Sequence, residues 1–351
     1  MPEEIDVIDP LGRSGWDDLV LSSPNYSFFH SADWARVLHE AYGYKPVYIS
    51  IGRSGKIAAV IPCMEVKSIL TGTRAVSLPF SDYCEPIVLD GDAGREAIED
   101  LIGRLFDYGK QAAWRSIDLR WDTVALQQAP PSFTCYGHTI DLTDTESQAF
   151  SKLRDSTRRN IKKAIGEGVK VEVFDSMSAL REFYRLNCLT RKAHGLPPQP
   201  FRFFEKVYEH VVAKGKGIVV LASHQGANVA GAVYVHLGQK AIYKYGASDR
   251  GFQHLRANNL VMWEAIRWYS GRGFRSLCLG RTERTNPGLL QFKRGWNAQE
   301  RAIRYYRYDV RRESFVTEAA ASRSNGGNSL FRRMPIPLLR MTGSVLYRHI
   351  G

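Results

Sequence analysis

A lysine lies between an aromatic residue and an arginine in the segment Gly288-Leu-Leu-Gln-Phe-Lys-Arg-Gly-Trp296. The segment follows a strand-like stretch and the polar loop GRTERTNPG, and it leads into a second strand-like stretch, AIRYYRYDV. In such a position Lys293, beside Phe292, could hold a fixed positive charge against an oxyanion or a phosphate. The alternative is a surface lysine on a helical turn.

A second group of polar residues ends an apolar stretch in SLPFSDYCEP. Asp82 and Tyr83 follow this predicted strand, and prolines stand on both sides of them. Junctions between strands and loops commonly carry binding groups, so this pair is a candidate for substrate contact. The alternative is an aspartate that only forms an Asx-type turn.

A third candidate is the basic stretch RDSTRRNIKKA. Helical spacing places Arg154, Arg158 and Lys162 on one face, with Arg159 and Lys163 beside them. Five like charges repel one another unless water or an anion faces them, so the stretch predicts a solvated face or a contact with phosphate or nucleic acid.

The end of the chain mixes apolar residues and arginines in LFRRMPIPLLRMTGSVLYRHIG. Such a segment could dock on anionic lipid or pack on its own body. Pro335 and Pro337 shorten any helix here, which slightly favours packing.

The elements that position these residues are predicted twice in one order: helix, hairpin, strand, helix and strand. In the first half they are Ser31 to Ala41, the hairpin Val47 to Val66, Arg74 to Phe80, Arg95 to Tyr108 (ending near Gly109) and Ser116 to Trp121. In the second half they are Phe201 to Ala213, the hairpin Ile218 to Leu237, Lys240 to Ala247, Asn258 to Tyr269 and Ser276 to Gly280.

This order predicts an α/β (α+β) fold with mixed, mainly antiparallel sheets covered by helices. Between the halves, one helix closing at Gly166 and Gly168 precedes a strand, and 321–328 form a linker-like run. We expect an N-terminal domain over 1–145, a C-terminal domain over 146–315 and a basic tail over 316–351.

Length and composition agree with two folded domains. The chain has 351 residues, of which 44% are hydrophobic and 11% aromatic, so a disordered or fibrous protein is excluded. Its net charge of +12 favours an anionic partner such as a phosphate-bearing substrate, nucleic acid or the inner face of a membrane.

Five scattered cysteines predict reduced thiols in the cytoplasm, and no metal site is expected. The sequence shows no signal peptide, spanning segment, Walker A loop, dinucleotide motif or nucleophile elbow.

The duplicated halves, the DY pair, RRNIKKAIGEGVKV, TRKAHGLP and above all FKRGW resemble the FemABX family, closest to its exosortase- and exopolysaccharide-associated branch. The resemblance covers roughly residues 15–310. It implies two tandem GNAT-like (N-acetyltransferase-fold) domains. Characterised members transfer an amino acid from aminoacyl-tRNA to an amine on a peptidoglycan precursor.

By this resemblance, Phe292 and Lys293 match the family's Phe-Lys pair, whose lysine steadies the charge of acyl transfer. Asp82 matches an acid that contacts the acceptor. The chain departs from the family in two ways: it lacks a long coiled-coil arm, and Arg256 and Asn258 replace small residues where a GNAT pyrophosphate loop would fall.

We therefore expect an amide-forming aminoacyltransferase or acyltransferase acting on a cell-wall or surface-polysaccharide precursor. The alternatives are an acyl-CoA-dependent N-acetyltransferase acting on a sugar or peptide amine, and a non-catalytic basic adaptor for RNA or glycan precursors. The predicted catalytic residues are Lys293 and Phe292, and the predicted substrate-binding residues are Asp82, Tyr83, Arg158, Arg159, Lys162, Tyr245, Arg256, Asn258 and Arg281.

No permanently bound cofactor is expected. The donor would be charged tRNA or acyl-CoA, and the acceptor a nucleotide- or lipid-linked glycan or peptide. The predicted location is the cytoplasm, with peripheral contact at the inner membrane.

Overall fold

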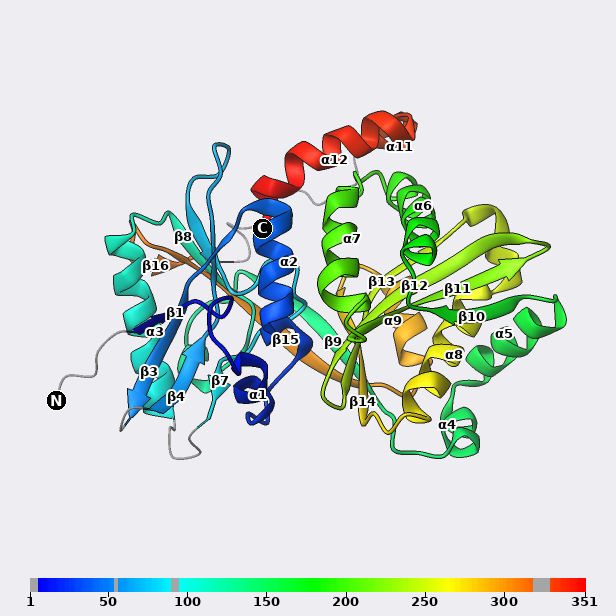
Figure 1. Cartoon of the computed structure of the whole chain (residues 1–351), viewed down its shortest axis with the longest axis horizontal. Coiled ribbons are helices and arrows are strands. Elements are labelled where there is room, and N and C mark those ends of the chain that lie inside the picture. Colours follow the sequence, from blue (N-terminus) through cyan, green and yellow to red (C-terminus); the bar gives the residue numbers. More distant parts are fainter. Residues whose placement is uncertain (1–5, 54–55, 90–94, 318–328) are drawn as a thin grey trace. The chain divides into compact units, whose positions relative to one another are not determined.

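The computed structural model describes residues 6–53, 56–89, 95–317 and 329–351. The chain divides into two compact units (Figure 1). The first unit contains 1–135, 302–325 and 346–351, and the second contains 136–301 and 326–345. The predicted linker 321–328 lies outside the described residues.

Helices of the first unit are α1 (Trp16–Leu21), η1 (Phe28–His30), α2 (Ala32–Tyr42), α3 (Arg95–Gln111) and η2 (Val124–Leu126). Its strands are β1 (Asp6–Ile8), β2 (Lys45–Pro46), β3 (Tyr48–Arg53), β4 (Lys56–Ile61), β5 (Met64–Val66), β6 (Arg74–Val76), β7 (Ile87–Val88), β8 (Ser116–Leu119) and β16 (Ser314–Phe315). One sheet has the order β1-β3-β4-β7, and α3 packs on β3 and β4.

Helices of the second unit are α4 (Glu146–Lys152), α5 (Asp155–Gly166), α6 (Met177–Ala193), α7 (Phe201–Val207), the π-helix η3 (Tyr208–Val212), η4 (Arg250–Leu255), α8 (Ala257–Ser270), α9 (Pro287–Arg294) and α11 (Ser329–Arg333). Its strands are β10 (Lys170–Phe174), β11 (Gly217–His224), β12 (Ala227–Leu237), β13 (Lys240–Ser248) and β14 (Ser276–Glu283). Three elements contain residues of both units: β9 (Phe133–Asp141), β15 (Gln299–Asp309) and α12 (Ile336–Ile350).

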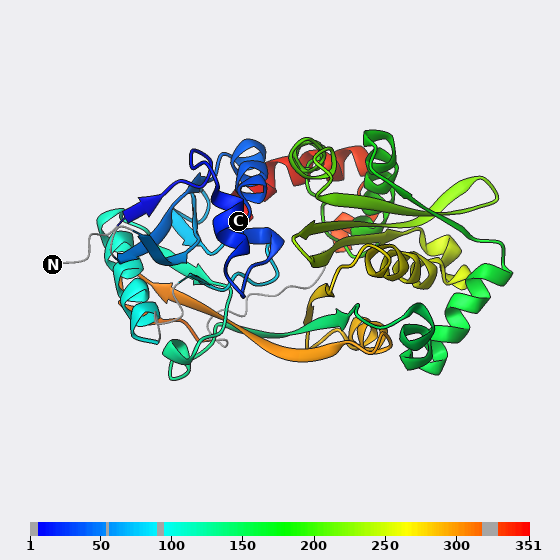
Figure 2. The same ribbon diagram turned by 60° about the horizontal axis from the view of Figure 1, so that its bottom comes forward.

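The second unit is a three-layer sandwich (Figure 2). Its strands run in the order β10-β11-β12-β13-β14, with α6 packed on one face and α8 on the other. Strands β11 and β12 form a hairpin whose two turn residues, Gln225 and Gly226, have φ values of 50° and 80°. Positive φ at both positions is the geometry of a type I′ turn, whose twist matches that of the strands.

The predicted repeat is confirmed within each unit. After its hairpin, the first unit has a parallel β6-α3-β8 crossover and the second a parallel β13-α8-β14 crossover. The neighbouring pairs β3-β4 and β4-β7 in the first unit and β10-β11, β11-β12 and β12-β13 in the second are antiparallel. The predicted mixed, mainly antiparallel fold is therefore confirmed.

The structure divides the chain at other positions than the predicted boundaries. The second unit begins at Tyr136, inside β9, and not at residue 146. Tyr306 to Asp309 of β15 pair with β8, and the stretch from Ala302 onward belongs to the first unit instead of the C-terminal domain. Helix α12 also crosses the division, so the predicted tail is shared between the units.

Two predicted elements have different ends. The strand from Arg74 stops at Val76, because Leu78 and Phe80 have positive φ values of 51° and 60° and bend the chain. Helix α3 runs through Gly109 to Gln111. A Cβ on that glycine would lie 3.0 Å from the Ile117 Cδ1 atom, so the glycine serves close packing and does not end the helix.

The single helix predicted between the halves is two helices, α4 and α5. Leu153 is extended and buried between them, and Arg154 is the N-cap of α5. At the end of the chain, α12 continues from Ile336 to Ile350 despite Pro337, because a proline in the first helical turn removes no hydrogen bond.

Candidate functional site

The predicted lysine is a buried cation. Asn286 caps the start of α9 by accepting a hydrogen bond from Leu289 N at 3.1 Å, and Pro287 occupies its first turn. Lys293, in the last turn, is only 3% exposed. Its Nζ donates to the carbonyl oxygens of Gly280 at 2.9 Å and Arg281 at 3.0 Å. The alternative of a surface lysine is therefore wrong.

The two carbonyl groups lie where β14 changes direction. Gly280 has a φ of 70°, which turns the strand, and its glycine identity makes that conformation accessible. Within the described residues, β13 and β14 pair in parallel only from Lys240 opposite Ser276 to Ile242 opposite Cys278, although both strands continue. Lys293 thus ties α9 to β14 beyond the point where the parallel pairing stops.

A cavity of about 540 Å³ lies beside this divergence in the second unit. Its size falls within the range of small-molecule sites. The lining comes from β12, β13, η4, the first turn of α8 and α9. The lining residues are Val229, Ala230, Tyr243, Ser248, Asp249, Phe252, Gln253, Arg256, Ala257, Asn258, Asn259, Gly288, Leu289 and Phe292.

Three predicted site residues converge on this cavity: Arg256, Asn258 and Phe292. Arg256 is the N-cap of α8 and has a φ of 59°, in the left-handed region. Its guanidinium makes no ion pair within the described chain. Asn258 donates from Nδ2 to Ser248 Oγ at 3.1 Å. An exposed cation beside the positive end of a helix dipole forms a site suited to an anion.

The aromatic member of the Phe-Lys pair faces the cavity, whereas the lysine does not line it. Phe292 packs edge-on against Trp296, with ring centroids 5.9 Å apart. Consecutive helical residues point about 100° apart, so α9 presents Phe292 to the cavity and directs Lys293 into the protein. Phe292 and Lys293 are thus adjacent in the sequence, but the first lines the cavity and the second lies in the protein interior.

The glycine of FKRGW is required by the close approach of α5. A Cβ on Gly295 would lie 2.4 Å from Thr157 Oγ1 and 3.2 Å from the Phe292 carbonyl oxygen. The Gly295 carbonyl oxygen also accepts a hydrogen bond from Arg154 N at 3.1 Å. These contacts join α9 to the start of the basic helix.

We expect Gly295→Ala to lower the free energy of unfolding by about 1–3 kcal/mol, because the added methyl group overpacks this contact. Urea unfolding measures the change. Gly288→Ala is the matched control on the same helix, since a Cβ there meets nothing within 4 Å. Thr157→Ala should recover part of the loss in the double variant. Strict additivity of the two changes would show that Thr157 is not the obstacle.

A second buried titratable group lies near Lys293. His138, on β9, is 1% exposed, and its Nε2 lies 2.9 Å from Glu300 Oε2. Arg294 donates to the same carboxylate through Nε at 2.7 Å and NH2 at 2.8 Å. Burial lowers the pKa of His138 despite the hydrogen bond to Glu300, and the positive charge of Lys293 adds to this decrease. The hydrogen bonds from Arg294 and His138 hold the pKa of Glu300 below its ordinary value.

This arrangement predicts a pH dependence of stability. The pKa of His138 in the folded protein lies below 6.5. The contribution of His138 to the free energy of unfolding is therefore fully present above pH 6.5 and is lost as the pH falls through the folded-state pKa. We expect His138→Gln to flatten the fall in unfolding free energy between about pH 7 and 5. Urea unfolding across this range measures the slope. His254→Gln, at an exposed histidine, should keep the wild-type slope. Equal slopes in all three proteins would contradict the prediction.

The remaining predicted residues of the second unit lie outside this cavity lining. Arg158 forms an ion pair with Asp155 and donates to the Ser151 carbonyl oxygen at 3.2 Å. Arg159 and Lys162 are exposed on α5, whose buried side packs on α8.

Tyr245 packs among the aromatic rings of α7, with centroids 5.4 Å from Phe204 and 6.2 Å from Phe203. Tyr243, two residues earlier, lines the cavity, because a bulge separates the two tyrosines in the pairing with β12. Arg281 has an exposed side chain, and its backbone carbonyl group receives Lys293.

Asp82 and Tyr83 belong to the first unit. They lie in the loop between β6 and β7. The Asp82 carbonyl oxygen accepts a hydrogen bond from the Tyr305 hydroxyl, and Tyr83 packs against a small core cluster that includes Tyr305. The loop is thereby attached to β15, and the acceptor contact predicted for Asp82 stays a prediction.

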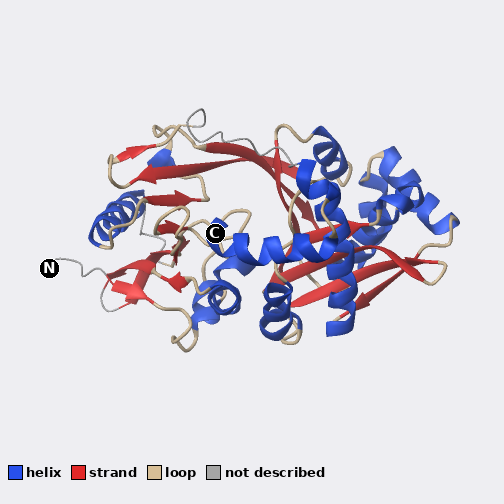
Figure 3. Cartoon of the chain, turned by 90° about the horizontal axis from the view of Figure 1, so that it is seen from above, coloured by secondary structure: helices blue, strands red, loops and turns tan. Residues whose placement is uncertain are grey.

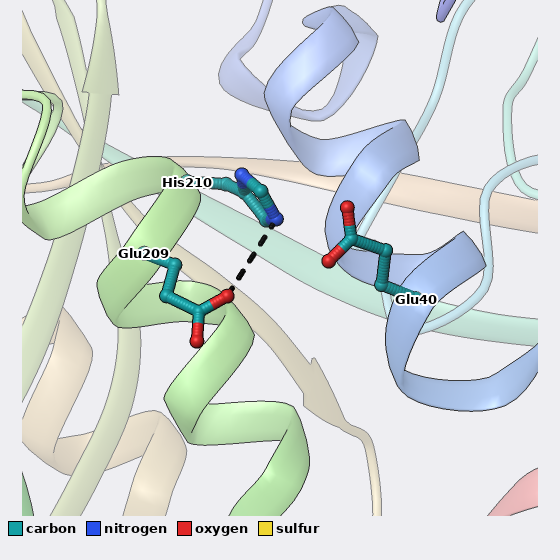
Figure 4. A group of neighbouring side chains, drawn as sticks. All are labelled: Glu40, Glu209 and His210. Atoms are coloured by element: carbon teal, nitrogen blue, oxygen red, sulfur yellow. Dashed lines mark ion pairs between the residues drawn. The ribbon is translucent and has the colours of Figure 1, made fainter.

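Sequence reasoning missed several cavity residues, among them Tyr243, Ser248, Asp249 and Asn259. Three of them (Ser248, Asp249 and Asn259) lie close in the sequence to Arg256 and Asn258, which the sequence analysis had singled out, and this proximity was the available signal. A pair of titratable groups on η3 was also missed. His210 Nε2 lies 4.0 Å from Glu209 Oε2 (Figure 4).

Known proteins resemble this chain at two levels: one family model matches within the second unit, and one relative is similar over most of the chain. Residues 151–294 match the family model described as an acetyltransferase (GNAT) domain. The UDP-N-acetylmuramoylpentapeptide-lysine N(6)-alanyltransferase of Weissella viridescens is 27% identical over 316 residues, which are 81% of this chain and 89% of the relative.

Two solved structures share the fold. The crystal structure of FemX has a TM-score of 0.68 at 15% identity and covers 86% of this chain and 96% of its own. The tandem GNAT protein from the clavulanic acid biosynthesis pathway has a TM-score of 0.57 at 9% identity, with coverage of 88% and 98%. These comparisons confirm the predicted tandem GNAT-like fold and support the predicted acyltransferase activity. The chain thus has the tandem GNAT-like fold of these structures, and residues 151–294 of its second unit match an acetyltransferase (GNAT) domain.

Proposed function

We propose that this protein is an amide-forming aminoacyltransferase that adds an amino acid to the side-chain amine of a lysine in a peptidoglycan precursor. The proposed acceptor is a UDP-N-acetylmuramoyl-pentapeptide and the proposed donor an aminoacyl-tRNA. The alanyltransferase of Weissella viridescens supports this assignment, because its likeness extends over most of both chains.

The cavity of the second unit is the observation that carries the proposal. It combines an apolar wall around Phe292 with an exposed arginine at a helix N-terminus. An aminoacyl ester has the matching features, namely a compact acyl group and a nearby phosphate. Arg256 would hold the phosphate, and Phe292 would limit the space around the acyl group.

The reaction needs positioning and charge stabilisation instead of a covalent enzyme intermediate. The acceptor amine attacks the ester carbonyl carbon, a C–N bond forms, and the carbonyl oxygen becomes negative. The C–O bond then breaks, and the ribose hydroxyl group leaves with the proton that the amine gives up. A fixed cation near this oxygen lowers the barrier most where water is excluded. Lys293, buried in the last turn of α9 next to the cavity-lining Phe292, would supply that charge.

The basic side of α5 provides the second part of the proposal. Arg159, Lys162 and Lys163 are exposed there, and all three face solvent on one short helix. Such a face can contact the phosphates of tRNA, and its contribution would fall as salt rises. Arg158 would contribute less, because it already pairs with Asp155.

A transfer assay tests the function. Purified protein would be mixed with the UDP-linked pentapeptide and either alanyl-tRNA or acetyl-CoA, and the product mass would be measured. A mass increase that requires charged tRNA and lysine in the acceptor is expected. If neither donor gives a product, or if the product keeps a free lysine amine, this function is wrong.

An acyl-CoA-dependent acyltransferase is the second candidate. The match of residues 151–294 to an acetyltransferase domain favours it, and Arg256 could equally hold the pyrophosphate of coenzyme A. The same assay separates the two donors, since this candidate predicts product with acetyl-CoA alone.

A further inference from the structure

The C-terminal helices present an apolar stripe to solvent. In the second unit, α11 and residues 336–345 of α12 lie beside α6 and α7 (Figure 3). Leu338, Met341 and Val345 are 49%, 62% and 57% exposed, and their spacing places them on one face of the helix. Leu330, on α11, is 61% exposed. Large apolar side chains gathered in this way are unusual on the surface of a folded domain.

The opposite face of α12 is packed and holds the stripe outward. Leu339 is fully buried. A Cβ on Gly343 would lie 2.0 Å from the Pro198 carbonyl oxygen, so the helix backbone touches the protein at this glycine. Arg340 stacks over the Tyr184 ring at 5.3 Å. Rotation of the helix to bury the stripe would break these contacts.

The same C-terminal segment carries unpaired positive charge in its sequence. Arg332 and Arg333 are exposed on α11, and the sequence contains no acidic residue after Glu318. Burial lowers the pKa of His194, and the positive charges of Arg250, Arg191 and Arg332 add to this decrease. Arg332 thus acts on the same histidine of the second unit as two arginines outside the C-terminal segment.

We propose that this face docks on an anionic lipid bilayer, with the apolar stripe entering the interface and the arginines contacting headgroup phosphates. A basic helix with apolar residues along one side has the composition of an interfacial helix. Among the described residues, no helix is long and apolar enough to cross a membrane, so the attachment would be peripheral. Arginine stems can lie along the apolar region while their charged ends stay at the headgroups.

Charge favours lipid over a second copy of the chain. In a symmetric dimer through this face, the same arginines would meet without any carboxylate of the segment to pair with them. An anionic bilayer supplies negative charge at the depth where the apolar residues insert. The inference does not depend on the proposed reaction.

Vesicle sedimentation tests the docking. The full chain would be mixed with vesicles of phosphatidylcholine alone or with about one third phosphatidylglycerol, at two salt concentrations. We expect at least a tenfold stronger partition to the anionic vesicles, weakened by salt. Arg332→Gln/Arg333→Gln should reduce it about 25-fold, because each charge near such a surface contributes about fivefold.

Two further variants complete the test. Leu338→Ser/Met341→Ser/Val345→Ser should reduce partition at least tenfold, with unchanged unfolding because these side chains are exposed. Arg311→Gln/Arg312→Gln removes the same charge from an exposed arginine pair elsewhere and should change partition less than twofold. The proposal would be overturned if the two double-arginine variants lost vesicle binding equally, or if the protein showed no preference for anionic vesicles. A dimer in solution that the serine variant dissociates would also overturn it and assign the face to a second copy.

The proposed reaction is tested separately. A soluble acceptor reaches the enzyme without a membrane, so the tail variants should keep their transfer activity in solution. Loss of vesicle binding with full activity is the result expected if both inferences hold.

Discussion

Lys293→Met is expected to lower the turnover number by roughly 10²–10³-fold while the Michaelis constant changes little. Methionine has a similar length and no charge, so the variant removes the cation and keeps most of the volume. The Michaelis constant should be spared because Lys293 does not line the cavity that would bind the donor. Steady-state transfer kinetics with alanyl-tRNA measure both quantities.

The same variant tests a structural role. The carbonyl oxygens of Gly280 and Arg281 would lose the ammonium donor, and an unsatisfied buried acceptor costs about 1–3 kcal/mol. Removal of a buried charge offsets part of this cost. Unfolding should therefore be measured in parallel, at a temperature where the variant is fully folded.

Arg294→Met is the matched control for Lys293→Met. It removes the adjacent cation of α9, which forms an ion pair with Glu300 on the surface. Exposed pairs of this kind contribute at most about 1 kcal/mol to stability, so turnover should stay near the wild-type value. Unchanged turnover in a folded Lys293→Met protein would remove the lysine from the reaction and leave it as a structural tie between α9 and β14.

Arg256→Asn is expected to raise the dissociation constant of the phosphate-bearing donor about 10- to 100-fold. Hydrogen bonds to a charged group contribute about 1.5–3 kcal/mol each, and the exposed guanidinium is the one cation among the residues that line the cavity in the described structure. The salt dependence of binding should also become weaker, because one phosphate contact is lost. Equilibrium binding at two salt concentrations measures both effects.

Asparagine is chosen because Arg256 occupies the left-handed region with a φ of 59°. Asparagine tolerates this conformation better than most residues, so the free energy of unfolding should be unchanged or higher. Arg250→Asn is the control, since this exposed arginine belongs to the neighbouring η4 and does not line the cavity. If both variants bind the donor equally well, the cavity does not hold its phosphate.

Much of the fold could be predicted from local patterns. Alternating apolar residues around Gln225 and Gly226 predicted a hairpin, and helical spacing predicted most of α8. The repeated order of elements predicted two similar halves, because internal similarity needs only the order of the segments and not their packing. The predicted ends of elements were less accurate where a long-range contact decides them, as at Gly109, which packs on Ile117.

The site was only partly predictable. Arg256, Asn258 and Phe292 were all singled out in the sequence, and the structure gathers them around one cavity. The sequence pattern could not show that Tyr243, and not Tyr245, lines the cavity. The bulge that places the two tyrosines in different surroundings arises only when β13 pairs with β12. Likewise, the ion pair with Asp155 that occupies Arg158 depends on the break between α4 and α5.

The sequence by itself determined the types of residue available and the order of the elements that carry them, since both depend on neighbours along the chain. It determined a basic protein with two α/β halves and a Phe-Lys pair near the end of the second. Only the tertiary structure decided that Lys293 is buried against two carbonyl groups while Phe292 faces a cavity. Burial and cavity shape come from segments far apart in the chain, so no local pattern contains them.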